Sequence, residues 1–207
     1  MKNINTYINK AMSFKLTRDY KKPYNYHPKT KDELEDIVKQ LIKDRGEEAD
    51  LNDIDTSAIT DMRHLFEDSN FNGDISQWDV SNVKNMYLMF SDSKFTGKNG
   101  DISNWDVSNV KDMKFMFSDS KFNGDISKWD VSNVENMSAM FYKTYFTGKN
   151  GDISNWDVSN VKDMHMMFSY SDFDGDISKW DVSNVKDMDS IFTGCPLQNN
   201  PPKWYKK

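Results

Sequence analysis

The chain has 207 residues, of which 37% are hydrophobic and 14% aromatic, enough for one continuous core or for a small array of repeats. Its formal net charge of −6 is unevenly placed, because residues 1–31 carry +7 and residues 51–195 carry −11. An acidic body repels phosphate groups, so the composition argues against nucleic-acid binding except through the basic N-terminal segment.

The sequence predicts neither export nor a membrane span. The N-terminus lacks the apolar run and the cleavage site of a secretory signal, and no window approaches about 18 consecutive apolar residues. Cys195 is the only cysteine, so no disulfide can form within the chain. We therefore expect a cytoplasmic protein that makes no contact with a membrane.

Residues 1–50 are expected to form an N-terminal segment and a helical cap. A short helix near residues 3–13 is followed by an extended stretch. Thr30 and Glu33 make the S/T-x-x-E pattern of a capping box directly before the segment DELEDIVKQLIKD. The apolar residues of that segment fall on one face of a helix: Leu34, Ile37, Val38, Leu41 and Ile42. This helix should cover the first of the repeats that follow.

A repeated unit, DISxWDVSNVxxMxxMF, governs residues 51–195. Its isoleucine recurs with spacings of 27, 24, 27 and 24 residues, at Ile75, Ile102, Ile126, Ile153 and Ile177. A degenerate copy that begins at Leu51 precedes them, which makes six repeats. The longer spacing arises where the junction reads FTGKNGD, at 95–101 and 146–152, instead of FNGD or FDGD.

Within a unit, the apolar period changes partway. Ile75, Trp78 and Val80 have the spacing of a short inward-facing strand, as in L-x-x-L-x-L. The apolar residues that follow lie on one face of a short helix: Val83, Met86, Met89 and Phe90. The pattern predicts an α/β repeat fold, a right-handed leucine-rich-repeat-like solenoid of six turns with a parallel sheet on one face and short helices on the other.

These repeats resemble those of bacterial surface proteins and mycoplasma lipoproteins, the BspA-like branch of the leucine-rich repeats. The resemblance covers about residues 51–195, where the unit recurs five times almost unchanged. It implies a right-handed solenoid used for adhesion or protein binding. Because the chain shows no signal, lipobox or wall anchor, we expect a stand-alone member of bacterial or phage origin.

Residues 196–207 are expected to form a C-terminal cap. This segment holds too many prolines for a helix. We expect Leu197 and Trp204 to close the far end of the array, so that the solenoid is capped at both ends.

Stacking places the same residue of every repeat in one column. The tryptophans from Trp78 to Trp180 are flanked by inward-facing Ile and Val, which predicts a core position. The residue after each of these positions is an outward-facing acid: Asp55, Asp79, Asp106, Asp130, Asp157 and Asp181. Adjacent strands lie about 4.8 Å apart, so neighbouring carboxylates would repel by roughly 0.8 kcal/mol even in water. Hydrogen bonds from nearby Ser, Asn or backbone groups would offset this repulsion, and a basic partner or a row of cations are the alternatives.

A further acidic column follows the junction glycines. Its members are Asp74, Asp101, Asp125, Asp152 and Asp176. Gly-Asp is typical of turns, and the N-G-D-I-S motif matches no calcium-binding loop closely. We therefore expect neither a metal nor a cofactor.

Specificity is expected from the side chains that differ between repeats. The residue before each tryptophan varies, and Asn104, Lys128 and Asn155 lie beside the central aspartates. On the predicted helices, residues such as Phe115 are either contact residues or partly buried between neighbouring helices. The candidate partner-binding residues are Asp79, Asp106, Asp130, Asp157, Asp181, Asn104, Lys128, Asn155 and Phe115.

The sequence contains no pattern typical of an enzyme. The three histidines do not recur between repeats, and Cys195 lacks the pattern of a nucleophile. Phosphate-binding and dinucleotide-binding glycine motifs are missing as well. We expect a non-enzymatic protein-binding module, a phage- or host-encoded intracellular inhibitor or adaptor that docks a partner protein on the solenoid surface. The alternative is a structural component of a surface or virion assembly, such as an adhesin.

Overall fold

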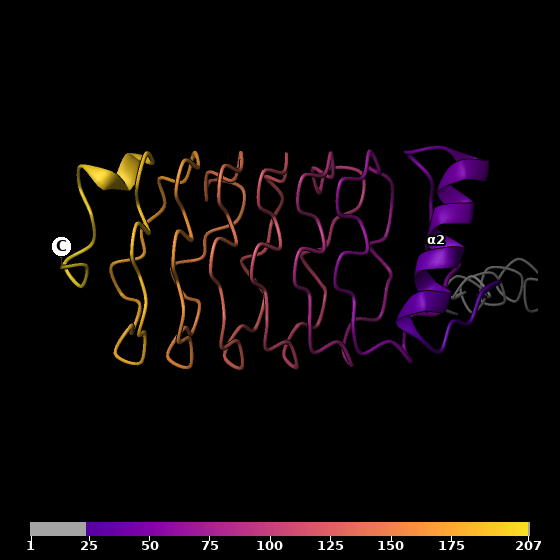
Figure 1. The fold of residues 1–207 in the computed structure, drawn as a ribbon, viewed down its shortest axis with the longest axis horizontal. Helices are drawn as coiled ribbons and strands as arrows, with labels where there is room; N and C mark the ends of the chain where they lie inside the picture. Colours follow the sequence, from indigo (N-terminus) through magenta and orange to yellow (C-terminus); the bar gives the residue numbers. More distant parts are fainter. Residues whose placement is uncertain (1–23, 207) are drawn as a thin grey trace, which may run out of the picture.

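The computed structural model describes residues 24–206 and shows a row of coils lying side by side (Figure 1). Each repeat forms one coil, and the coils begin at Leu51, Ile75, Ile102, Ile126, Ile153 and Ile177. Helix α2 (Lys31–Arg45) lies across one end of the row, and the 3-10 helix η1 (Pro196–Gln198) belongs to the other. Residues 24–206 contain no further helix and no β-strand.

The predicted fold class is therefore wrong: residues 24–206 do not form a six-turn solenoid with a parallel sheet on one face and short helices on the other. The β-bridges between neighbouring coils are isolated and parallel, and they do not extend into a sheet. Five of these bridges follow one column of residues: Asp61, Asn85, Asp112, Asn136, Asp163 and Asp187. The helix predicted near residues 3–13 lies outside the described residues.

The segment predicted as a helix in each repeat is a pair of turns, because its N–H groups bond to the next coil. In the second coil the N–H groups of Met86, Leu88, Phe90 and Asp92 donate to carbonyl oxygens of the third coil at 2.8–3.1 Å. An α-helix would instead need the Phe90 N–H to donate to the carbonyl four residues earlier. The other N–H groups close local turns, such as Met89 N–H to the Met86 carbonyl at 3.1 Å. All five junctions between coils repeat this arrangement.

The segment predicted as a strand is also broken by turns. The Asp74 carboxylate accepts the N–H of Ser76 at 2.9 Å, and the Trp78 N–H donates to the Ile75 carbonyl at 3.1 Å. The next turn has the same form, because Asp79 accepts from the N–H of Ser81 at 3.0 Å. The D-x-S sequences thus encode corners in which the aspartate side chain caps the turn. Corners at this spacing leave too few extended residues for a strand.

Aromatic side chains stack along the core from coil to coil, as expected for the tryptophan column. Trp78 to Trp180 are all buried, with 3–5% of their surface exposed. Each indole N–H donates to a main-chain carbonyl of the preceding coil, as Trp129 does to Ile102 at 3.0 Å. Beside them run two columns of stacked phenylalanines, in which the Phe90 and Phe117 ring centres lie 5.6 Å apart. Burial and a satisfied indole donor together fix the register of one coil on the next.

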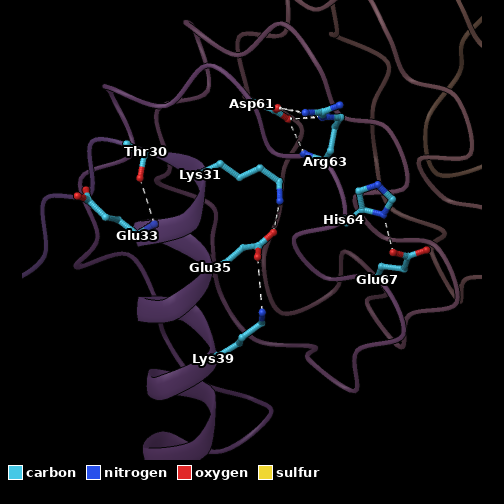
Figure 2. Close-up of polar contacts among 9 residues, drawn as sticks. All are labelled: Thr30, Lys31, Glu33, Glu35, Lys39, Asp61, Arg63, His64 and Glu67. Atoms are coloured by element: carbon cyan, nitrogen blue, oxygen red, sulfur yellow. Dashed lines mark hydrogen bonds and ion pairs between the residues drawn. The ribbon is translucent and has the colours of Figure 1, made fainter.

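The helix predicted over the segment DELEDIVKQLIKD is confirmed as α2. The Thr30 hydroxyl accepts the N–H of Glu33 at 3.2 Å, and Lys31 and Lys39 lie on either side of the Glu35 carboxylate (Figure 2). Three residues of the predicted apolar face are buried against the core, and the other two are partly buried there: Leu34, Val38, Leu41, then Ile37 and Ile42. The helix therefore covers the first coil, and it is capped at its C-terminus by Gly46, whose φ is 91°.

An ion pair that the sequence did not predict attaches this helix to the first coil. Both terminal guanidinium nitrogens of Arg45, Nη1 and Nη2, donate to the Asp53 carboxylate, at 2.8 and 2.9 Å, and Asn25 donates to the same group at 2.8 Å. The Asp53 side chain is only 4% exposed. Hydrogen bonding from Arg45 lowers the pKa of Asp53 to about 2, and the same contact raises the pKa of Arg45.

The C-terminal segment closes part of the last coil, as predicted for Leu197 and Trp204. Both side chains are half-buried against the core. The Trp204 indole donates to the Ile177 carbonyl at 2.8 Å, so it continues the tryptophan column one position beyond the repeats. Tyr205 meets the ring of Phe192 edge to face at 5.2 Å.

Replacing a central tryptophan should destabilise the stack more than replacing the terminal one. We expect Trp129→Ala to lower the free energy of unfolding by about 3–5 kcal/mol, the usual range for a large aromatic lost from a core. Trp204→Ala should cost less, because a coil lies on only one side of Trp204. Denaturant unfolding of both variants checks this, and equal losses would contradict it.

The Arg45–Asp53 pair should make stability depend on acid pH. Because the folded pKa of Asp53 is about 2 and its ordinary value is 3.8, the contribution is fully present above the ordinary value and is lost as pH falls through the folded one. At neutral pH, Asp53→Asn should therefore lower the free energy of unfolding by about 2 kcal/mol. This deficit should shrink between about pH 5 and about pH 2 in denaturant titrations. A deficit that does not change with pH would show that the ion pair contributes nothing.

Candidate functional site

The outward-facing aspartates occupy equivalent corners of successive coils. Asp55 is partly buried, with His27 3.2 Å from its carboxylate, whereas the other five predicted members are exposed: Asp79, Asp106, Asp130, Asp157 and Asp181. Each accepts the N–H of the serine two residues later at 3.0–3.1 Å. For Asp79 and Asp106 that serine's hydroxyl donates as well, at 2.6 Å. The structure thus shows the local hydrogen bonds that were one of the three readings of this column.

At Asp157 the local hydrogen bonds outweigh the repulsion from the neighbouring carboxylate. Hydrogen bonds from Ser159 hold the pKa of Asp157 below its ordinary value, while the charge of Asp181 acts in the opposite direction and more weakly. Ser183 likewise lowers the pKa of Asp181. The column is therefore a row of exposed carboxylates, each of which accepts its local backbone hydrogen bond through one oxygen, Oδ1. Such a row is suited to receive cationic side chains.

The variable residues before the tryptophans lie on the surface as predicted, with one exception. Asn104, Lys128 and Asn155 are exposed, and the Lys128 ammonium donates to the Asn104 amide oxygen at 3.3 Å. Asn104 also lines a hollow of about 410 Å³ with Ser76 and other residues. Asp53, at the same position of the first coil, is the exception, because Arg45 binds it in the buried pair described above.

Phe115 is half-buried and belongs to a row of rings on the surface of three coils. The row consists of His64, Tyr87 and Phe115. The Tyr87 ring centre lies 5.1 Å from that of His64 and 6.3 Å from that of Phe115, both edge to face. The Lys114 ammonium lies over the Phe115 ring, 5.4 Å from its centre. The structure thus favours partial burial over full exposure for Phe115.

The residues at this position of every coil have positive φ. The angle is 56° at Phe115 and lies between 51° and 62° at the equivalent residues: His64, Leu88, Ala139, Met166 and Ser190. The left-handed region costs an ordinary L-residue roughly 1–2 kcal/mol, and glycine is the residue that suits it. Only side chains other than glycine occupy the position, although it is strained in every coil.

The second acidic column forms turns, as its Gly-Asp pattern indicates. Each member accepts the N–H of the serine two residues later, as Asp125 does from Ser127 at 2.8 Å. No group of three or more His, Cys, Asp or Glu side chains in residues 24–206 is arranged to hold a metal ion. The same part of the chain contains no helix with the length and apolar character of a membrane span.

The two histidines within the coils lie beside carboxylates, and the cysteine is buried. His64 pairs with Glu67 at 2.6 Å in the first coil (Figure 2), and His165 lies 3.7 Å from Asp187. Cys195 is buried, and burial raises the pKa of its thiol, which leaves it protonated and unreactive at neutral pH.

A hollow between the two long junctions was missed from the sequence. Its volume is about 780 Å³, and it lies over Gly124 in the short junction, with Gly97 and Lys98 on one side and Tyr145 and Asn150 on the other. Tyr145 is 57% exposed. The alternation of 27-residue and 24-residue spacings was the signal, because a short junction between two long ones leaves a depression.

A column of asparagines was also missed. The side-chain amide of each donates to a serine carbonyl of the preceding coil at 2.7–2.9 Å: Asn82, Asn109, Asn133, Asn160 and Asn184. The invariance of Asn in the DVSNV segment was the signal, because a solvent-facing residue without a partner would be free to vary between repeats.

Comparison with known families rests on the repeats. The family described as Mycoplasma protein of unknown function, DUF285, matches residues 34–149 and 121–206, so its two matches together cover most of the chain. The chain belongs to the DUF285 family. The matched residues of DUF285 include the whole coil stack and most of α2. No curated protein and no solved structure matches the chain.

The aspartate column allows its structural role to be separated from its charge. We expect the triple change of Asp106, Asp130 and Asp157 to Ala to lower the free energy of unfolding, by up to about 1 kcal/mol per lost hydrogen-bond acceptor. The same triple change to Asn should leave stability nearly unaltered, because the amide oxygen can still accept the serine N–H. Thermal and denaturant melts of the two triple variants check this, and equal stability losses would contradict it.

Proposed function

We propose that this protein is a non-enzymatic protein-binding module that docks a partner on the exposed corners of its coils. One observation carries the proposal: the coils repeat the same internal bonds, whereas several solvent-facing positions, such as the one before each tryptophan, differ from coil to coil. A constant interior with a varied exterior is the arrangement by which repeat arrays recognise proteins.

The aspartate column supplies the charge for such docking. Asp106, Asp130 and Asp157 lie at its centre, and each accepts the local hydrogen bond from its serine N–H through one carboxylate oxygen, Oδ1. Lys128 and its neighbours add residues that differ between coils. An acidic row of this kind suits a partner with a basic surface, since complementary charge mainly raises the rate of association.

The ring row supplies apolar contact area. Aromatic side chains dominate the energetics of many interfaces, and Phe115 and Tyr87 are rings that remain partly open to solvent. Backbone strain at Phe115 supports a role in contact. A glycine at this position would adopt the left-handed conformation without strain, but it would remove the aromatic ring. A strained position that keeps a large side chain is a candidate for function.

Within this proposal, the chain is a DUF285 member of the BspA-like kind, and it acts as an intracellular inhibitor or adaptor of bacterial or phage origin. Its cytoplasmic location and its lack of catalytic activity stay predictions from the sequence. The assembly role, as part of a surface or a virion, stays the alternative.

The proposal is tested by a charge-matched pair of triple variants. The first changes Asp106, Asp130 and Asp157 to Asn. The control changes the exposed Asp92, Asp119 and Asp172 to Asn and so removes the same charge elsewhere. The wild type and both variants are each used to capture proteins from the native host. A protein that the wild type and the control retain, and that the first variant retains less, is then purified.

Kinetics with the purified partner decide the outcome. We expect the first triple variant to associate about tenfold more slowly, with a flatter dependence on salt, while the control matches the wild type. Phe115→Gly should fold normally and dissociate faster. Equal behaviour of both triple variants, or a partner bound equally well by all of them, would contradict docking on these corners.

A further inference from the structure

The last coil leaves open the bonding groups that every earlier coil uses to hold its successor. In the fifth coil the N–H groups of Met164 and Met166 donate to the sixth coil at 2.8 and 3.0 Å. The equivalent N–H groups of Met188 and Ser190, and that of Phe192, have no acceptor among residues 24–206. Gly194 completes the row and is satisfied within the cap by the Gln198 side chain.

Two acceptors beside these donors are open for the same reason. The Ser159 carbonyl accepts the side-chain amide of Asn184, and the Lys162 carbonyl accepts the N–H of Lys186 at 2.8 Å. In the last coil the corresponding carbonyls belong to Ser183 and Lys186, and no donor in the described part of the chain reaches them. The terminal edge therefore consists of two carbonyls, at Ser183 and Lys186, followed by three N–H groups at Met188, Ser190 and Phe192.

Apolar side chains along the terminal edge are also less buried than their equivalents in the preceding coil. Val182, Val185 and Met188 are only partly buried, whereas Val158, Val161 and Met164 in the preceding coil are at most 1% exposed. The C-terminal segment protects a different part of the coil, because Trp204 and Tyr205 pack on Ile177 and Phe192. Terminal coils of repeat arrays ordinarily present a polar face, and this one does so only in part.

We propose that the terminal edge binds a coil of the same repeat pattern carried by another protein. The five internal junctions define what such an occupant must supply: carbonyls at alternate residues for the N–H groups, an asparagine amide for the Ser183 carbonyl, and apolar residues over Val182, Val185 and Met188. Main-chain pairing at an open edge gives affinity, and the side chains give selectivity.

A second copy of this chain fits the terminal edge poorly if it binds head to tail, with its first coil against the last coil of its neighbour. Its first coil has Ala58 at the position of the asparagine column, so it cannot donate to a preceding coil. The same end is covered by α2, whose Leu34 and Val38 are buried against the core. The residues proposed for docking, Asp106, Asp130 and Asp157, belong to earlier coils, so this inference does not depend on docking there.

Amide hydrogen exchange of the full chain tests the proposal residue by residue. The probe is a synthetic peptide that copies residues 102–125, one coil of the repeat. In the free protein, the N–H groups of Met188 and Ser190 should exchange faster than those of Met164 and Met166. Saturating peptide should slow exchange at Met188, Ser190 and Phe192 by at least about tenfold.

Matched variants tie the effect to the terminal edge. Val185→Asp and Met188→Glu should abolish the protection while the melting transition of the stack is retained, whereas Asp172→Asn should leave it intact. A control peptide with Asp in place of its residues Val110 and Met113 should protect nothing.

Three results would overturn the proposal. The first is no change in exchange with the repeat peptide at millimolar concentration. The second is protection that survives Met188→Glu. The third is protection of the same amides in the protein alone as its concentration rises, with a dimer in sedimentation velocity, because a second copy would then be the occupant.

Discussion

Alternate main-chain N–H groups that reach from one coil to the next hold this protein together. Met86, Leu88, Phe90 and Asp92 use their donors in this way, and the same four positions recur at every junction. An N–H group that donates to the next coil cannot also donate within an α-helix, which the sequence of these segments would otherwise favour. The left-handed residues follow from this demand, because the chain must turn back at Leu88 and Asp92 to keep every second N–H facing the next coil.

The sequence predicted what local chemistry decides. Thr30 and Glu33 marked the start of the helix, and the flanking apolar residues placed the tryptophans in the core. Strands and helices within the repeats were predicted wrongly, because Met86, Met89 and Phe90 bury the same face whether they lie on a helix or on a pair of turns. Periodicity reports which side chains are buried, and it does not report where the N–H groups find their acceptors.

The candidate site shows the same division. Exposure of Asp106 and Lys128 was predictable, since each stands next to an inward residue in a known pattern. The Arg45–Asp53 pair was not, because it joins the cap to the one repeat that departs from the consensus. A single substitution in a degenerate copy carries no periodic signal. The repeat pattern concerns only the interior residues, so it does not predict what each exposed residue binds.

The junctions between coils have a consequence for how this family can change in length. Residues 75–125 and 126–176 are near-copies, and each contains one long and one short spacing. If residues 75–125 were removed, Asp74 would join Ile126 and restore the sequence FNGDIS across the new junction. Every acceptor and every ring would meet its ordinary partner. A recombination event between the two copies would thus shorten or lengthen the array by a whole pair of repeats, and each product could still fold. The length of the protein can therefore change by one pair of repeats in a single genetic step.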